Sequence, residues 1–122
     1  MTDARPDPEA ALVWRRLGEE GALRELYARL DPRFGLDTSA LRDLLVRLDR
    51  EHDAGITLSV TVQVATALPI LLGSRGPTPE RAAQAALDGH SMVAFAATDV
   101  GAAGSELTDL TTCVRLDGDD VR

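Results

Sequence analysis

The sequence predicts a mainly α-helical fold with a short C-terminal β part. Apolar residues recur with helical spacing over most of the first 89 residues. After that the pattern changes to a continuous apolar run of strand length, residues 92–98. Near the end, Asp117-Gly118-Asp119 is typical of a hairpin turn. We therefore expect a helical domain over residues 1–89 and the incomplete start of a β-domain over residues 90–122.

The first helical pattern follows Pro6 and Pro8. Four of its apolar residues are expected on one broad face: Leu12, Val13, Trp14 and Leu17. Gly18 and Gly21 are expected to loosen or break this helix. The helical period then resumes at four positions: Leu23, Leu26, Tyr27 and Leu30.

A turn and another helix come next. The turn is predicted over Asp31-Pro32-Arg33-Phe34-Gly35, because proline disfavours helix at the preceding residue and glycine permits unusual backbone angles. The helix is expected to begin near Thr38 or Ser39, which can cap it. Its apolar residues follow an i, i+3, i+4, i+7 spacing that predicts a core-facing stripe: Leu41, Leu44, Leu45 and Leu48.

Residues 56–72 allow two interpretations. Up to Val64, apolar residues alternate with polar ones, which is typical of a strand. Beyond Val64 the alternation is lost, and the apolar residues suit a buried helix that Pro69 kinks. The residues alone favour a strand for the first half.

The remaining predicted elements are a short helix and two strands. The helix is predicted over residues 79–87, with Thr78 as its N-cap and Pro79 at its first position. Residues 111–116 alternate between apolar and polar, and the hairpin turn that follows leads to Val121.

Composition and charge limit the classes of partner. Twenty acidic residues against thirteen basic ones give a formal net charge of -7, so the positive surface that nucleic acid requires is missing. All the basic residues are arginine, which suggests a GC-rich bacterial genome. Cys113 is the only cysteine, so no internal disulfide forms and a cytoplasmic location is expected. The longest apolar stretch, residues 56–72, contains too many polar residues to predict a membrane span.

The candidate site follows the apolar run directly. Thr98 ends that run, a glycine-rich stretch follows, and Ser105 supplies a second hydroxyl. This pattern is typical of a backbone that approaches a cofactor's polar edge and phosphates closely. The alternative is a turn that the two hydroxyls close.

Three other polar segments predict no metal or catalytic site. The consecutive ligand types of Glu51-His52-Asp53 point in different directions on a helix, so a solvated helix end is expected. His90 is expected in an exposed loop. The acidic residues around the hairpin turn lack the spacing of a calcium loop.

Several short motifs follow one another in a characteristic order along most of the chain. They are Leu17-Gly18-Glu19-Glu20-Gly21, the Pro32-x-Phe34-Gly35 turn, the helix over 41–50, Asp53-Ala54-Gly55, Leu68-Pro69-Ile70-Leu71-Leu72-Gly73, Thr78-Pro79-Glu80-Arg81, Leu87-Asp88-Gly89, Phe95-Ala96-Ala97-Thr98-Asp99, Gly104-Ser105-Glu106, Thr111-Thr112 and Asp117-Gly118-Asp119. In this order the chain resembles the acyl-CoA dehydrogenases, flavoenzymes with an N-terminal helical domain, a middle β-domain and a C-terminal helical bundle.

The resemblance implies a helix over residues 56–72 and an FAD cofactor. Backbone groups at Phe95 and Ala97, with the Thr98 hydroxyl, would face the pyrimidine edge of the flavin. Gly104 and Ser105 would approach the pyrophosphate, and Ser105 would also line the acyl-CoA channel. The chain departs from the family's Thr-Glu-Pro at Thr98-Asp99-Val100, and it carries one additional residue before Gly104.

The implied activity is FAD-dependent α,β-dehydrogenation of an acyl-CoA or related acyl thioester, a step of fatty acid metabolism. In the family the catalytic base lies in the C-terminal part, so no catalytic residue is assigned here. We therefore expect a fragment or a split subunit, completed by a partner polypeptide or the remainder of the enzyme and inactive alone. The alternatives are a non-catalytic interaction module that docks a partner chain and a relative that binds acyl-CoA without oxidising it.

Overall fold

The computed structural model describes residues 8–28, 35–94, 116–117 and 120–121. The elements are α1 (Pro8–Glu19), α2 (Ala22–Ala28), α3 (Thr38–Glu51), α4 (Ala54–Val62), a π-helical turn (Gln63–Ala67), α5 (Leu68–Gly73), α6 (Pro77–Leu87), β1 (Leu116–Asp117) and β2 (Asp120–Val121). The predicted mainly α-helical class is confirmed for the described part of the chain.

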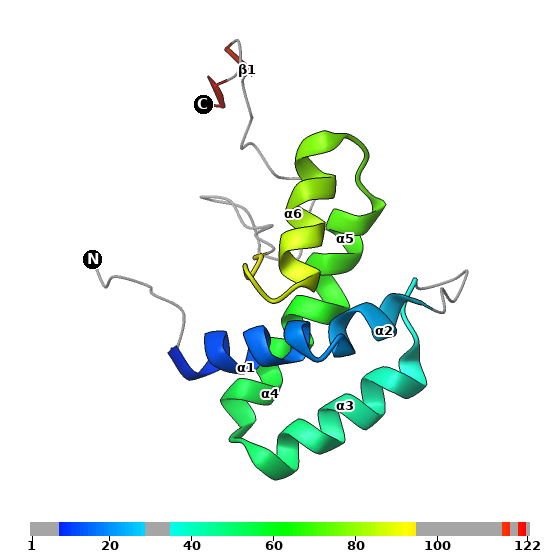
Figure 1. Ribbon diagram of the computed structural model, residues 1–122, viewed down its shortest axis with the longest axis vertical. Coiled ribbons are helices and arrows are strands. Elements are labelled where there is room, and N and C mark those ends of the chain that lie inside the picture. The colour runs from blue at the N-terminus through cyan, green and yellow to red at the C-terminus, as the bar shows by residue number, and fades with distance from the viewer. Residues whose placement is uncertain (1–7, 29–34, 95–115, 118–119, 122) are drawn as a thin grey trace, which may run out of the picture.

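The long helical segment made by α4, the π-helical turn and α5 runs through the centre of the helical part (Figure 1). Helices α1 and α3 pack on α4, and α6 packs beside α5. The largest fully buried side chains come from five helices, α1 to α5, and from the π-helical turn: Trp14, Leu17, Leu23, Leu26, Leu48, Ile56, Val60, Val64 and Leu68.

Helix α1 buries a narrower face than the sequence predicts. Its buried residues have an i, i+3, i+4, i+7 spacing: Ala10, Val13, Trp14 and Leu17. The prediction for Leu12 is wrong, because its side chain is 63% exposed. A single helical stripe includes Val13 and Trp14 but leaves Leu12 on the flank that faces away from the core.

The predicted N-caps of two helices are wrong. Asp37, rather than Thr38 or Ser39, caps α3, and its carboxylate accepts hydrogen bonds from the backbone N–H groups of Ser39 and Ala40 at 3.0 Å. Helix α6 begins at Pro77, two residues before the predicted start, so Thr78 lies inside the helix. Aspartate is as good an N-cap as serine, and it stands one position earlier.

The segment that alternates like a strand is helical. Ile56, Val60 and Val64 are buried, whereas Leu58 and Val62 between them are exposed. The strand interpretation of the residues alone is therefore wrong, and the helix that the resemblance implies is confirmed. Apolar residues at every second position fill the inner and the outer face of a helix alternately.

The irregularity in this long segment comes before Pro69. The π-helical turn Gln63–Ala67 leads into α5, where Pro69 occupies the first turn. Proline has no backbone N–H and its ring crowds the carbonyl four residues earlier, so regular α-helical bonding cannot continue through this point. A π-helical turn accommodates that break within one continuous helix.

Helix α1 contacts the end of α6 through backbone atoms. A Cβ placed on Gly18 would lie 2.3 Å from the Asp88 carbonyl carbon and the Gly89 nitrogen. Gly89 has a φ of +77° and lies against the carbonyl oxygens of Trp14 and Arg15. The two glycines therefore allow the two backbones to touch.

The described β-structure is a short antiparallel ladder. Leu116 pairs with Val121 and Asp117 pairs with Asp120, which confirms the hairpin predicted around residues 117–119. Of the strand predicted over residues 92–98, residues 92–94 are described and form no strand, so the prediction is wrong there. Residues 95–98 and 111–115, together with Leu30 and the turn residues 31–34, lie outside the described residues. Gly35, the last residue of that turn, has the expected positive φ of +62°.

Candidate functional site

The residues predicted to hold the cofactor lie outside the described part of the chain: Phe95, Ala97, Thr98, Gly104 and Ser105. The structure describes the segment that leads directly to them, Ser91–Ala94, which follows α6. We call these four residues the lead segment. Its placement decides where the candidate site begins.

The chain leaves α6 through a Schellman motif. The Gly89 N–H donates to the Ala86 carbonyl at 3.0 Å, and the His90 N–H donates to the Ala85 carbonyl at 2.9 Å. The positive φ of Gly89 makes this geometry accessible without strain. In the sequence, the glycine after Leu87-Asp88 is the signal for this motif. The motif sets the direction in which the lead segment leaves α6.

Trp14 holds the start of the lead segment. Its indole Nε1 donates to the Ser91 carbonyl oxygen at 2.8 Å, and its side chain is fully buried. Buried indoles usually satisfy their single N–H donor in this way. A residue of α1 therefore fixes a segment 77 residues later in the chain.

Gln63 holds the other end of the lead segment. Its Oε1 accepts from the Val93 N–H at 2.8 Å, and its Nε2 donates to the Val93 carbonyl. One buried amide thus pairs with both backbone groups of a single residue, as a neighbouring strand does. No local sequence pattern signals this bond, because the two residues are 30 positions apart.

The π-helical turn positions this glutamine. The turn begins at Gln63, and the Val64 carbonyl accepts a 2.6 Å hydrogen bond from the Tyr27 hydroxyl of α2. The wider turn offers carbonyl oxygens that a regular helix would bond internally. Tyr27, Val64 and Gln63 are all buried, so adjacent residues of the turn bond to α2 on one side and to the lead segment on the other.

Burial raises the pKa of Tyr27 well above its ordinary value of 10.0. The folded state therefore disfavours tyrosinate. The stability that protonated Tyr27 contributes is fully present below about pH 10 and is lost as the pH rises above that value. We expect the free energy of unfolding to fall between about pH 8 and about pH 11, and Tyr27→Phe to flatten that fall. Urea titrations of the chain and of Tyr27→Phe at both pH values measure this fall in the free energy of unfolding. A fall in the variant as large as that in the unsubstituted chain would contradict the expectation.

Gln63→Leu is expected to release the lead segment. The substitution keeps the volume of the side chain but leaves the backbone N–H and carbonyl of Val93 without this partner. The expected loss is about 1–3 kcal/mol in the free energy of unfolding, with faster amide exchange at Val93. Gln84→Leu is the matched control. Gln84 is exposed and accepts one bond from Arg24, so a loss as large as that of Gln63→Leu would contradict the assignment.

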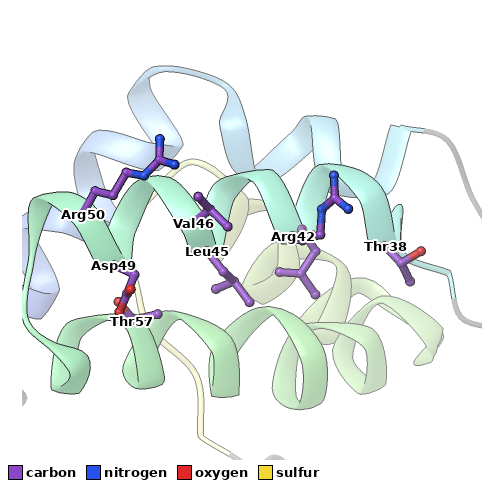
Figure 2. Close-up of a pocket in the computed structure, with 8 residues that line it drawn as sticks. Thr38, Arg42, Leu45, Val46, Asp49, Arg50 and Thr57 are labelled. Atoms are coloured by element: carbon purple, nitrogen blue, oxygen red, sulfur yellow. The ribbon is translucent and has the colours of Figure 1, made fainter.

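A second feature is an apolar groove between α3 and α4 with a volume of about 460 Å³. Figure 2 shows its lining residues along α3 and at Thr57 of α4. Leu41 and Leu45 belong to the predicted core-facing stripe of α3, but they line this groove and are only half-buried, whereas Leu44 and Leu48 are buried. Helix α3 thus has one apolar row in the core and another beside it.

The structure describes two of the other polar segments, residues 51–53 and His90. No group of three potential metal ligands occurs among the described residues. His52, the C-cap of α3, has a side chain that is only 14% exposed, with its Nδ1 3.6 Å from the Glu9 carboxylate, so the expected solvated helix end is wrong at this residue. His90 is exposed after the Schellman motif. Cys113 lies outside the described residues.

Comparison with known proteins finds no matching family model, no matching curated protein and no matching solved structure. Within the described part, one helix, Ala54–Gly73, is long and apolar enough to cross a bilayer by length and composition alone, so the expectation that residues 56–72 are too polar for a membrane span is wrong on this criterion. Core helices of soluble proteins meet the same criterion. The protein is therefore not clearly membrane-bound.

Proposed function

We propose that this chain is the N-terminal part of an acyl-CoA dehydrogenase-like flavoprotein. The order of its sequence motifs supports this proposal, as does the mainly helical unit that precedes the candidate cofactor residues. One structural observation carries it furthest. Gln63 and Trp14 hold the lead segment at two points, and this segment directly precedes the candidate cofactor residues in the sequence.

Within this proposal each residue has a role toward FAD. Backbone groups of Phe95 and Ala97 and the hydroxyl of Thr98 meet the pyrimidine edge, and Gly104 and Ser105 meet the pyrophosphate. Donors at the pyrimidine edge favour negative charge on the reduced ring. When bound, FAD supplies the hydride acceptor for α,β-dehydrogenation of an acyl thioester. The chain's own task is to bind and orient it.

The bidentate pairing at Val93 suits that task. A segment that presents backbone groups to a cofactor needs a fixed direction, because an error of about 1 Å at the site is costly. Gln63 supplies this direction from inside the helical core, where its own position is set by the π-helical turn. In our proposal the π-helical turn therefore serves the site that follows the lead segment.

The test is a visible absorption spectrum of the chain purified from its native host, with co-purifying polypeptides identified by intact mass. The expected result is a flavin spectrum together with the remainder of the enzyme, either as a further polypeptide or as a continuation of the same chain. Gln63→Leu should reduce the bound flavin, and Gln84→Leu should leave it unchanged. A folded, colourless chain that purifies alone would refute the cofactor assignment.

A non-catalytic interaction module is the second candidate, and the exposed apolar surface of α4 favours it. Leu58 is 63% exposed on a helix without charged residues. Such a module folds stably without flavin, so thermal unfolding with and without added FAD separates the two functions. A midpoint that FAD leaves unchanged supports the module.

A further inference from the structure

The backbone carbonyl of Val64 lacks its regular helical partner. In an α-helix this carbonyl would accept a hydrogen bond from the N–H of the residue four positions later, Leu68. Here the Leu68 N–H donates to the Gln63 carbonyl instead, which is the i to i+5 pattern of a π-helix. The Val64 carbonyl therefore loses the donor that a regular helix would give it.

The π-helical pattern supplies no replacement donor. Continued by one residue, it would pair the Val64 carbonyl with the N–H of residue 69, but Pro69 has no N–H. Val64 is fully buried, so its carbonyl is shielded from solvent. A buried carbonyl without a partner is costly. The π-helical turn therefore depends on a donor from outside the long helical segment.

The Tyr27 hydroxyl of α2 is that donor. It donates to the Val64 carbonyl at 2.6 Å, and both residues are buried. The Leu68 N–H has two alternative acceptors, which are the Gln63 carbonyl in the π register and the Val64 carbonyl in the α register. Because the hydroxyl satisfies the Val64 carbonyl, the Leu68 N–H is available to Gln63. The bond from Tyr27 therefore favours the π register.

The α register is the alternative state of the same segment. In that register the Leu68 N–H returns to the Val64 carbonyl. Pro69 then leaves a different carbonyl without a donor, that of Ala65, four residues before the proline. Ala65 is exposed, so water can satisfy its carbonyl. Both registers are thus compatible with Pro69, and the donor at Val64 distinguishes them.

Gln63 stands where the two registers diverge. Its N–H bonds back to α4 through the carbonyls of Ser59 and Val60, whereas its own carbonyl accepts the π-helical bond from Leu68. Its side chain pairs with both backbone groups of Val93 in the lead segment. The two registers differ in residues per turn, so a change between them rotates the backbone that carries this amide. That rotation breaks the pairing with Val93.

We propose that the Tyr27 hydroxyl selects the π register of Gln63–Ala67 and thereby keeps Gln63 bonded to the lead segment. Tyr27 is then a positioning residue that acts through a backbone element with two states, which is the physical basis of coupling between separate parts of a fold. A movement of α2 that withdraws the hydroxyl releases the lead segment. This inference does not depend on the proposed flavin function.

Hydrogen-bond scalar couplings measured by NMR show which carbonyl accepts the Leu68 N–H. We expect a coupling to Gln63 in the full chain and to Val64 in Tyr27→Phe. Amide exchange at Val93 should be at least about tenfold faster in Tyr27→Phe, as expected when a buried backbone group loses its partner.

Gln63→Leu is the matched control. It removes the pairing with Val93 directly, so Val93 should again exchange faster. The register is set by Tyr27, however, so the Leu68 coupling should stay with the carbonyl of residue 63. Leu44→Ala, a core substitution on α3, controls for a general loss of stability and should also leave that coupling in place.

The proposal is overturned if the Leu68 N–H still couples to residue 63 in folded Tyr27→Phe, or if exchange at Val93 is unchanged in that variant. It is also overturned if the full chain itself shows the coupling to Val64, or if Leu44→Ala moves the coupling there. Should Tyr27→Phe be unfolded in buffer, trimethylamine N-oxide favours its folded state for the same measurements.

Discussion

Gly18→Ala is expected to lower the free energy of unfolding by about 3 kcal/mol, the upper end of the range for overpacked sites. The added Cβ would lie 2.3 Å from the Asp88 carbonyl carbon and the Gly89 nitrogen. These are backbone atoms, so no rotamer change relieves the collision. The chain must move α1 away from the end of α6 or distort the Schellman motif. Both responses also disturb the lead segment.

Urea denaturation followed by fluorescence measures this effect, because Trp14 is the only tryptophan. Gly73→Ala is the matched control. A Cβ at Gly73 meets no atom within 4 Å and its φ is not positive, so alanine should change stability by at most about 1 kcal/mol, in the stabilising direction. If the two variants are equally stable, the backbone contact between α1 and α6 does not exist.

Trp14→Ala is expected to cost about 3–5 kcal/mol, as for other fully buried tryptophans. The loss combines a cavity in the core with an unpaired Ser91 carbonyl. Trp14→Phe separates the two contributions, because it keeps most of the apolar volume and removes the N–H donor. The phenylalanine variant should lose about 1–3 kcal/mol. Circular dichroism is the measurement, since both variants lack the fluorophore.

Leu12→Ala serves as the control on the same helix. Leu12 is 63% exposed, and substitutions at such surface positions usually change stability by no more than about 0.5 kcal/mol. A loss at Leu12 comparable to that at Trp14 would show that α1 buries the broad face that the sequence predicts. That result would contradict the packing described here.

The helical spacing predicted those parts of the fold that depend on local periodicity. Val13, Trp14 and Leu17 are buried as expected, and Gly21 separates α1 from α2. The prediction for Leu12 was wrong because apolar residues stand next to one another in this helical turn. Spacing alone then does not show which of them faces the core. The hairpin was predictable because turn residues constrain the backbone directly.

The alternation that begins at Ile56 shows where local patterns fail. Strand spacing and the spacing of a helix with two apolar faces look alike over one short segment, and only the packing partners distinguish them. Here α1 and α3 cover the inner face of α4. Leu58 and Val62 lie on the outer face and stay exposed. A long-range property thus decided a local structure.

The candidate site was predictable only as a stretch of sequence. Its hydroxyls and glycines form a local pattern, whereas the residues that hold the preceding lead segment are Trp14 and Gln63, which are 77 and 30 positions from their partners. Neither residue type signals such a bond from sequence. The structure therefore shows which residues hold the lead segment, whereas the candidate site itself lies outside the described residues.

The bond from Trp14 to Ser91 also affects how the protein is made. The indole of Trp14 finds its partner only after 77 further residues have been synthesised. At synthesis rates of about 5–20 residues per second the nascent chain waits several seconds for this bond. The N–H of Trp14 is thus made well before the carbonyl that satisfies it, so this part of the core closes only after the lead segment has been synthesised.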